Sequence, residues 1–255
     1  MPPSSPTPEP ALPPGPALPS ESALPAPPRA PRRRDRPTRR TALTVEGIVA
    51  AAIEVLDETG VLGLSMRAVA QRLGTGAASL YAHVSSKEEL LELVFDELVG
   101  RVSLPEPDPE RWRDQLQEMA AELRQVLISH RDVALAGLGR IPSSPNVLAA
   151  AEVVVAVMRA GGLSDRVLAL GLDQLLLFVA ASAFEDSLYE SRGLTPEELA
   201  GYFEEVHVFY QRLPVDRFPV LASIAEDMTG PDGDERFVFG VDALLSGFEA
   251  MSRTA

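Results

Sequence analysis

The side chains able to carry chemistry are few and scattered in this 255-residue chain. It has no cysteine, and its three histidines, His83, His130 and His207, lie far apart in the sequence. Glu185 and Asp186 are adjacent carboxylates, but neighbouring residues on a helix point about 100° apart, which argues against a shared acid–base site. With no nucleophile–base pair, cofactor loop or metal-ligand spacing present, the sequence predicts no enzyme activity, no cofactor and no metal site.

Residues 65–84 are the segment in which residue types and spacing best fit a function. Two short helical patterns, 65–73 and 77–83, flank the glycine turn 74–76, and small residues open the second of them. Four apolar residues can close a small core shared by the two helices: Val69, Leu73, Leu80 and Val84. Such a second helix can bring its N-terminal end to base edges in the major groove, and Ser65 can offer its hydroxyl to a phosphate. The segment therefore predicts a helix-turn-helix that binds DNA.

The neighbouring sequence predicts helices that hold this motif in place. Apolar residues recur at helical spacing from Val45 to Leu56, with Thr44 as the expected N-cap and Gly60 as the stop. A further helix follows Ser85 and Ser86, either of which has the spacing of a capping box.

The chain downstream of residue 103 is also expected to be helical. The prolines of 104–109 mark a break, and Asp108 followed by Pro109 is typical of a helix start. The β-branched run 153–158 is interpreted as helix because a Gly-Gly stop follows it. Residues 167–184 are apolar nearly all round, which favours a helix buried by a partner over a membrane span. The predicted fold class is all-α.

The N-terminal 43 residues differ in composition from the rest. They hold 14 of the 23 prolines, and residues 29–43 carry seven arginines against one aspartate although the net charge is −14. We expect a disordered tail at 1–43, a helix-turn-helix domain at 44–103 and a second helical domain at 104–255. The arginines suit a phosphate-binding arm, a solubilising linker, or an artefact of the chosen translation start. No signal peptide is evident, so a cytoplasmic location is expected.

Residues 44–102 resemble the DNA-binding domain of the TetR family of bacterial transcriptional regulators. The resemblance rests on the glycine turn, on Leu-Tyr-Ala-His-Val at 80–84 and on Ser-Lys-Glu-Glu-Leu-Leu at 86–91. It implies contacts with bases or the adjoining backbone by four residues: Arg67, Ala78, Ser79 and Tyr81. It also implies phosphate contacts by Ser65, His83 and Lys87, which is the only lysine in the chain.

The later part of the chain is similar, at landmarks such as 129–132 and 239–242, to the C-terminal domain of tetracycline-repressor-type proteins. The resemblance implies a ligand-binding unit that dimerises through two helices, here about 165–189 and 234–251. The metal-binding histidine of the family falls on Gly137, so tetracycline–magnesium chemistry is not expected. The expected pocket residues are Met119, Leu123, Val153, Phe178 and Tyr189, with Arg140 and Glu185 as orienting charges.

Taken together, the sequence predicts a regulator that binds double-stranded DNA at a palindromic operator as a homodimer. A small-molecule inducer, largely apolar, would release it. The alternative is a helical enzyme or a sequestering protein that binds small molecules without regulating DNA. Repression and activation are not separable from the sequence.

Overall fold

Helix α1 (Val45–Gly63) starts where the sequence predicts, because the hydroxyl of Thr44 accepts a hydrogen bond from the backbone N–H of Gly47 at 3.1 Å. The regular helix bends at Gly60, whose φ of 70° lies in the left-handed region that glycine adopts most readily. The expected stop is therefore a kink, and one more turn follows it. This computed structural model describes residues 43–130, 132–137, 143–191 and 195–253.

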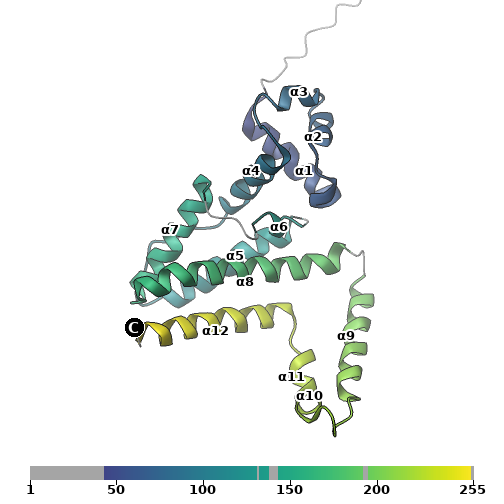
Figure 1. Ribbon diagram of the computed structural model, residues 1–255, viewed down its shortest axis with the longest axis vertical. Helices are drawn as coiled ribbons and strands as arrows, with labels where there is room; N and C mark the ends of the chain where they lie inside the picture. The colour runs from purple at the N-terminus through teal and green to yellow at the C-terminus, as the bar shows by residue number, and fades with distance from the viewer. Residues whose placement is uncertain (1–42, 131, 138–142, 192–194, 254–255) are drawn as a thin grey trace, which may run out of the picture. The chain divides into compact units, whose positions relative to one another are not determined.

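The described residues form helices and no strand, which confirms the all-α fold class (Figure 1). After α1 the helices are α2 (Met66–Arg72), α3 (Ala77–Leu80), α4 (Lys87–Val99), α5 (Trp112–Ile128), α6 (Ala134–Gly137), α7 (Pro145–Ala160), α8 (Asp165–Ser191), α9 (Pro196–Gln211), α10 (Pro219–Ser223), α11 (Ala225–Thr229) and α12 (Gly233–Arg253).

Two apolar cores hold these helices together. The first core packs the four helices α1, α2, α3 and α4 together. It includes Ile48, Leu56 and Leu98, all with no exposed surface. The second joins α5, α7, α8 and α12 around residues such as Leu116 and Leu245. Because a fully buried leucine or isoleucine contributes roughly 1.5–3 kcal/mol, these cores are the main source of stability.

Two local expectations are corrected by the structure, and one open alternative is decided. Helix α5 begins at Trp112 rather than after Asp108, because Asp108 instead closes a turn by accepting the N–H groups of Glu110 and Arg111. The helix expected over 77–83 ends at Leu80 and continues as a turn. Of the two serines before α4, Ser86 is the N-cap and accepts the N–H of Glu89 at 3.1 Å.

The β-branched run 153–158 lies inside α7, as predicted. Helix α8 packs mainly against α5, α12, α7 and α6, and Figure 1 shows α12 running alongside it. Residues Asp165–Leu188 of α8 are long and apolar enough to cross a membrane by length and composition, and 39% of their most apolar window is buried within the chain. Helices α9, α10 and α11, which were not predicted individually from the sequence, pack mainly on one another.

Candidate DNA-binding and ligand-binding sites

Helices α2 and α3 have the geometry of a helix-turn-helix. The turn works because Gly74 has a φ of 63°, and Thr75 N–H then bonds to the carbonyl of Ala70 at 2.9 Å to close the end of α2. Leu80 and Val84 have no exposed surface and pack in the first core with Val69, while Leu73 is partly buried against it. The small shared core predicted from the sequence is therefore present.

Arg72 fixes α2 against α1. Its guanidinium pairs with Glu54 at 2.8 Å and with Glu58 at 2.5 Å. The hydrogen bond and charge of Arg72 lower the pKa of the Glu58 carboxyl. Arg72 is exposed, and its two ion pairs link the first helix of the motif to α1 at the surface.

The side chains expected to contact DNA bases lie on the surface of this motif. Arg67, Ala78, Ser79 and Tyr81 are all exposed, and Tyr81 presents 54% of its surface although it is a large aromatic residue. An exposed aromatic side chain beside a recognition helix is available to stack on or contact a partner.

The residues expected to hold phosphates are placed less uniformly. Ser65 caps α2 by accepting the N–H of Ala68 at 3.2 Å, and His83 is exposed in the turn after α3. Lys87 is half-buried, and its ammonium donates to the carbonyl of Val61 at 2.8 Å. Lys87 therefore joins the start of α4 to the end of α1.

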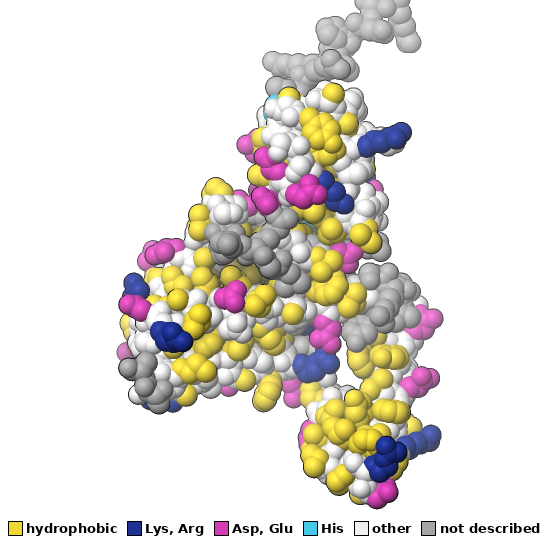
Figure 2. Space-filling view, viewed as in Figure 1, with side chains coloured by type: hydrophobic (Ala, Val, Ile, Leu, Met, Phe, Trp, Pro, Cys, Tyr) yellow, Lys and Arg dark blue, Asp and Glu magenta, His cyan; other side chains and the backbone are white. Residues whose placement is uncertain are grey.

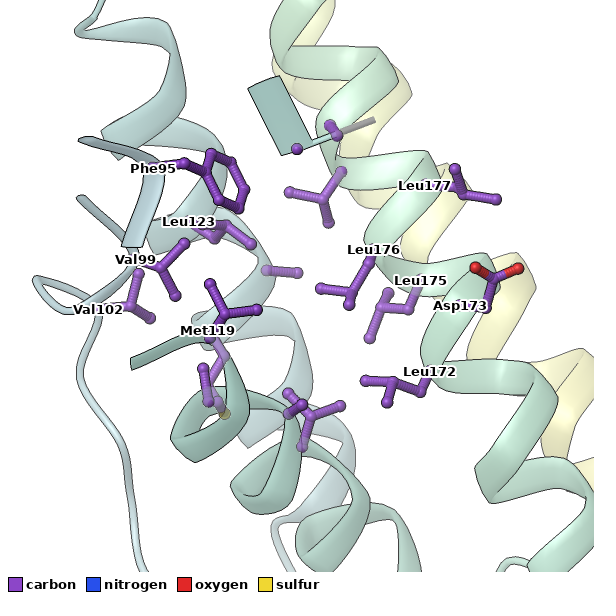
Figure 3. Close-up of a pocket in the computed structure, with 18 of the residues that line it drawn as sticks. Phe95, Val99, Val102, Met119, Leu123, Leu172, Asp173, Leu175, Leu176 and Leu177 are labelled. Atoms are coloured by element: carbon purple, nitrogen blue, oxygen red, sulfur yellow. The ribbon is translucent and has the colours of Figure 1, made fainter. Parts of the chain in front are cut away.

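A cavity of about 660 Å³ lies between α4, α5, α7 and α8 (Figure 3). Figure 3 shows Phe95, Val99, Met119 and Leu123 on one side, facing Leu172 and Leu176 of α8. The polar side chains among its described lining residues are Glu92, Ser143, Ser144 and Asp173. The carboxylate of Asp173 points to the side of α8 away from Phe95 and Met119. A cavity of this size and polarity suits a largely apolar organic molecule.

Two of the seven predicted ligand residues, Met119 and Leu123, line this cavity. Three lie outside the lining: Val153 is partly buried in the second core, Phe178 stacks on Phe237 with ring centroids 5.7 Å apart, and Glu185 pairs with Arg236 at 3.3 Å. Arg140 and the side chain of Tyr189 lie outside the described residues.

Sequence reasoning missed the contribution of α4 to the cavity. Phe95, Val99 and Val102 line it, although the sequence analysis placed them in the DNA-binding part of the chain. The sequence does carry a signal for this contribution, because α4 has more apolar positions than packing on α1 alone requires.

Gly137 lines this cavity at the position on which the family's metal-binding histidine falls. A β-carbon at Gly137 would lie 2.5 Å from Cζ of Phe95 and 2.7 Å from its Cε2, far inside van der Waals contact. The Phe95 ring fills the space into which a side chain at 137 would project. The described residues also contain no group of three metal-ligating side chains.

The exposed helix-turn-helix and the apolar cavity behind it define a DNA-binding regulator with a separate small-molecule site. Comparison with known sequences agrees. Residues 48–94 match the sequence model of the bacterial regulatory proteins of the tetR family, and residues 104–252 match the tetracyclin repressor-like C-terminal domain. The chain belongs to the TetR family of transcriptional regulators.

Individual relatives cover most of the chain. It is 34% identical over 222 residues to the HTH-type transcriptional repressor DrrR1 of Streptomyces coeruleorubidus, covering 83% of this chain and 79% of that one. It is 31% identical to the class D tetracycline repressor of Escherichia coli, covering 81% and 89%. The solved structure of ActR from Streptomyces coelicolor with actinorhodin aligns with a TM-score of 0.76 at 39% identity, covering 83% and 98%.

Proposed function

We propose that this protein represses transcription by binding a palindromic operator as a homodimer, and that a largely apolar small molecule releases it. The observation that carries the proposal is that α4 extends from the helix-turn-helix to the cavity. It starts at Lys87, just after the helix-turn-helix, and its Phe95 and Val99 line the cavity. A ligand that favours one position of α4 changes the position of the DNA-binding motif.

Relatives support the proposal of a small-molecule ligand. The solved structures include ActR in complex with actinorhodin and ActR in complex with (S)-DNPA. The cavity of this chain is lined mainly by leucine, valine and alanine, with Phe95 as its aromatic side chain among the described residues. We therefore propose a largely apolar organic inducer, and we propose neither enzymatic activity nor a cofactor.

The proposed ligand set consists of cavity residues from three helices, α4, α5 and α8: Phe95, Val99, Met119, Leu123, Leu172 and Leu176. The proposed DNA-binding set remains the one expected from the sequence. We also propose a tail at 1–43, a DNA-binding domain at 44–103, a ligand-binding and dimerisation domain at 104–255, and a cytoplasmic location. The spans of the two matched family domains, 48–94 and 104–252, support this division.

A homodimer is expected because α8 and α12 expose apolar side chains. Leu170 is 56% exposed on α8, and Phe239 and Met251 are 75% and 62% exposed on α12. Exposed apolar surface on two neighbouring helices is typical of an interface between two copies. Light scattering at micromolar concentration should give twice the chain mass of 27.4 kDa. A stable monomer under these conditions would exclude the dimer.

Footprinting on the DNA upstream of the gene for this protein tests operator binding directly. A symmetric protected region is expected, because the two-fold axis of a dimer imposes a palindrome. Release of that footprint by an apolar aromatic compound, and not by an equal concentration of solvent, tests the inducer. Absence of any protected region would contradict the operator proposal.

Two substitutions test the proposed DNA contacts. Tyr81→Ala should weaken operator binding about tenfold, and Lys87→Ala should lower the slope of log affinity against log salt by about one per subunit. Tyr202→Ala, at a tyrosine of similar exposure on α9, is the matched control and should bind like the parent. Because Lys87 also bonds to Val61, thermal melting must show that each variant is folded. Operator binding at parent strength by both variants would refute the assignment.

A further inference from the structure

Asp96 is a buried carboxylate inside the apolar stripe of α4, with 9% of its surface exposed. One of its oxygens, Oδ1, accepts the backbone N–H of Asn146 at 2.9 Å and that of Val147 at 3.1 Å. The side-chain amide of Asn146 donates to the other oxygen at 3.1 Å and to the backbone carbonyl of Asp96 at 3.2 Å. Four hydrogen bonds therefore join α4 to the first turn of α7.

These bonds give α7 the cap that its own sequence lacks. Ser144 is in the N-cap position but makes no side-chain cap hydrogen bond, and Pro145 at the first helical position has no N–H. The next two N–H groups have no partner within the helix, and both are bonded to Asp96. The negative charge also faces the positive end of the α7 dipole. A residue of the DNA-binding part of the chain thus caps a helix of the ligand-binding part.

The surroundings of this contact leave it little freedom. A β-carbon at Gly100, one turn after Asp96, would lie 2.8 Å from Nδ2 of Asn146, so a glycine makes room for that side chain. The residues on either side of the contact line the cavity: Phe95 and Val99 on α4, and Ser144 and Val147 at the start of α7. A ligand that fills the cavity therefore contacts both helices beside the bonds that join them.

We propose that Asp96 is a positioning residue that makes α4 and the first turns of α7 move as one unit. A change in the cavity wall then changes the DNA-binding motif, and a change in the motif changes the cavity wall. The transmission of inducer binding rests on the function proposed above. The physical link between α4 and α7 does not rest on it. Because coupling is reciprocal, DNA binding must then change the stability of α7, whether or not an inducer exists.

Hydrogen exchange of α7 with and without operator DNA tests this link and needs no inducer. The readout is deuterium uptake by backbone amides in residues 149–157, which lie beyond the amides bonded to Asp96. Operator binding should slow this uptake about fivefold in the parent, the lower end of ordinary coupling. The ratio of interest is the uptake rate without operator divided by the rate with operator. In Asp96→Ala this ratio should fall towards one, the value for a helix that does not respond to DNA. A cap with a purely structural role would raise both rates and leave the ratio unchanged.

Glu97→Ala is the matched control, because Glu97 is the next carboxylate on α4 and is exposed. It should keep the parent ratio. Asn146→Ala removes the two side-chain hydrogen bonds of the contact and keeps the two backbone ones, so it should lower the ratio less than Asp96→Ala does. The test therefore does not depend on the folding of one variant. An unchanged ratio in folded Asp96→Ala or Asn146→Ala, or no operator effect in the parent, would overturn the proposal. Failure of an inducer to release DNA would instead contradict the proposed function and leave these ratios as they are.

Discussion

Replacing Arg124 by methionine is expected to lower the free energy of unfolding by about 3 kcal/mol, because it leaves the partly buried carboxylate of Asp186 without its cation. Arg124 is only 5% exposed and joins three helices. From α5 it pairs with Asp186 of α8 at 2.7 Å and with Asp234 of α12 at 2.6 Å, and its guanidinium lies 4.8 Å from the centroid of the Phe237 ring. Burial acts to lower the pKa of Arg124, but the two carboxylates outweigh it and the pKa is raised, so the side chain stays charged.

Urea denaturation at a fixed protein concentration measures this loss, since the stability of a dimer depends on concentration. The estimate is at the low end of the range for buried pairs, because Asp234 is 77% exposed. Arg159→Met is the matched control. Arg159 pairs with Asp165 at 2.9 Å, but both side chains are exposed, and its loss should cost less than about 1 kcal/mol. Equal stability of the two variants would show that the Arg124 cluster does not hold the helices together.

The helix-turn-helix could be predicted from the sequence because its determinants are local. The spacing of Val69, Leu80 and Val84 and the turn at Gly74 lie within 16 residues, and the structure builds the core from them. The capping of α1 by Thr44 is equally local. The ion pairs of Arg72 could not be predicted, because Glu54 and Glu58 come from another helix and sequence spacing does not indicate such pairs.

The cavity was only partly predictable, because α8 is apolar on nearly every face. Periodicity cannot tell which of its residues meet a ligand and which meet α12, so Phe178 was assigned to the pocket although it packs on Phe237. The role of Asp96 was hidden for a related reason. A single carboxylate within an apolar stripe gives no indication of its partner, which here is 50 residues away in the chain.

The magnesium complex of tetracycline is expected to bind this cavity at least about a hundredfold more weakly than an apolar aromatic compound, because its polar groups would be buried without partners. Magnesium requires several oxygen or nitrogen ligands in near-octahedral geometry. The described lining offers no imidazole, and Phe95 occupies the space next to Gly137 from which one would project. The leucines and valines of the lining instead favour apolar rings.

Titration with N-phenyl-1-naphthylamine, whose fluorescence rises in apolar surroundings, measures the affinity of the cavity for an apolar aromatic compound. Displacement of this probe by tetracycline with magnesium measures the affinity of the cavity for the metal complex. Phe95→Ala should weaken binding of the probe about tenfold, since it removes a buried aromatic contact. Phe178→Ala is the matched control, because Phe178 is also half-buried but packs on Phe237 outside the cavity lining. The probe affinity of this variant should stay close to that of the parent.

Saturable micromolar competition by tetracycline that a chelator abolishes would show that the metal chemistry of the tetracycline repressors persists here despite Gly137. Equal loss in the two phenylalanine variants would place the ligand elsewhere among the helices.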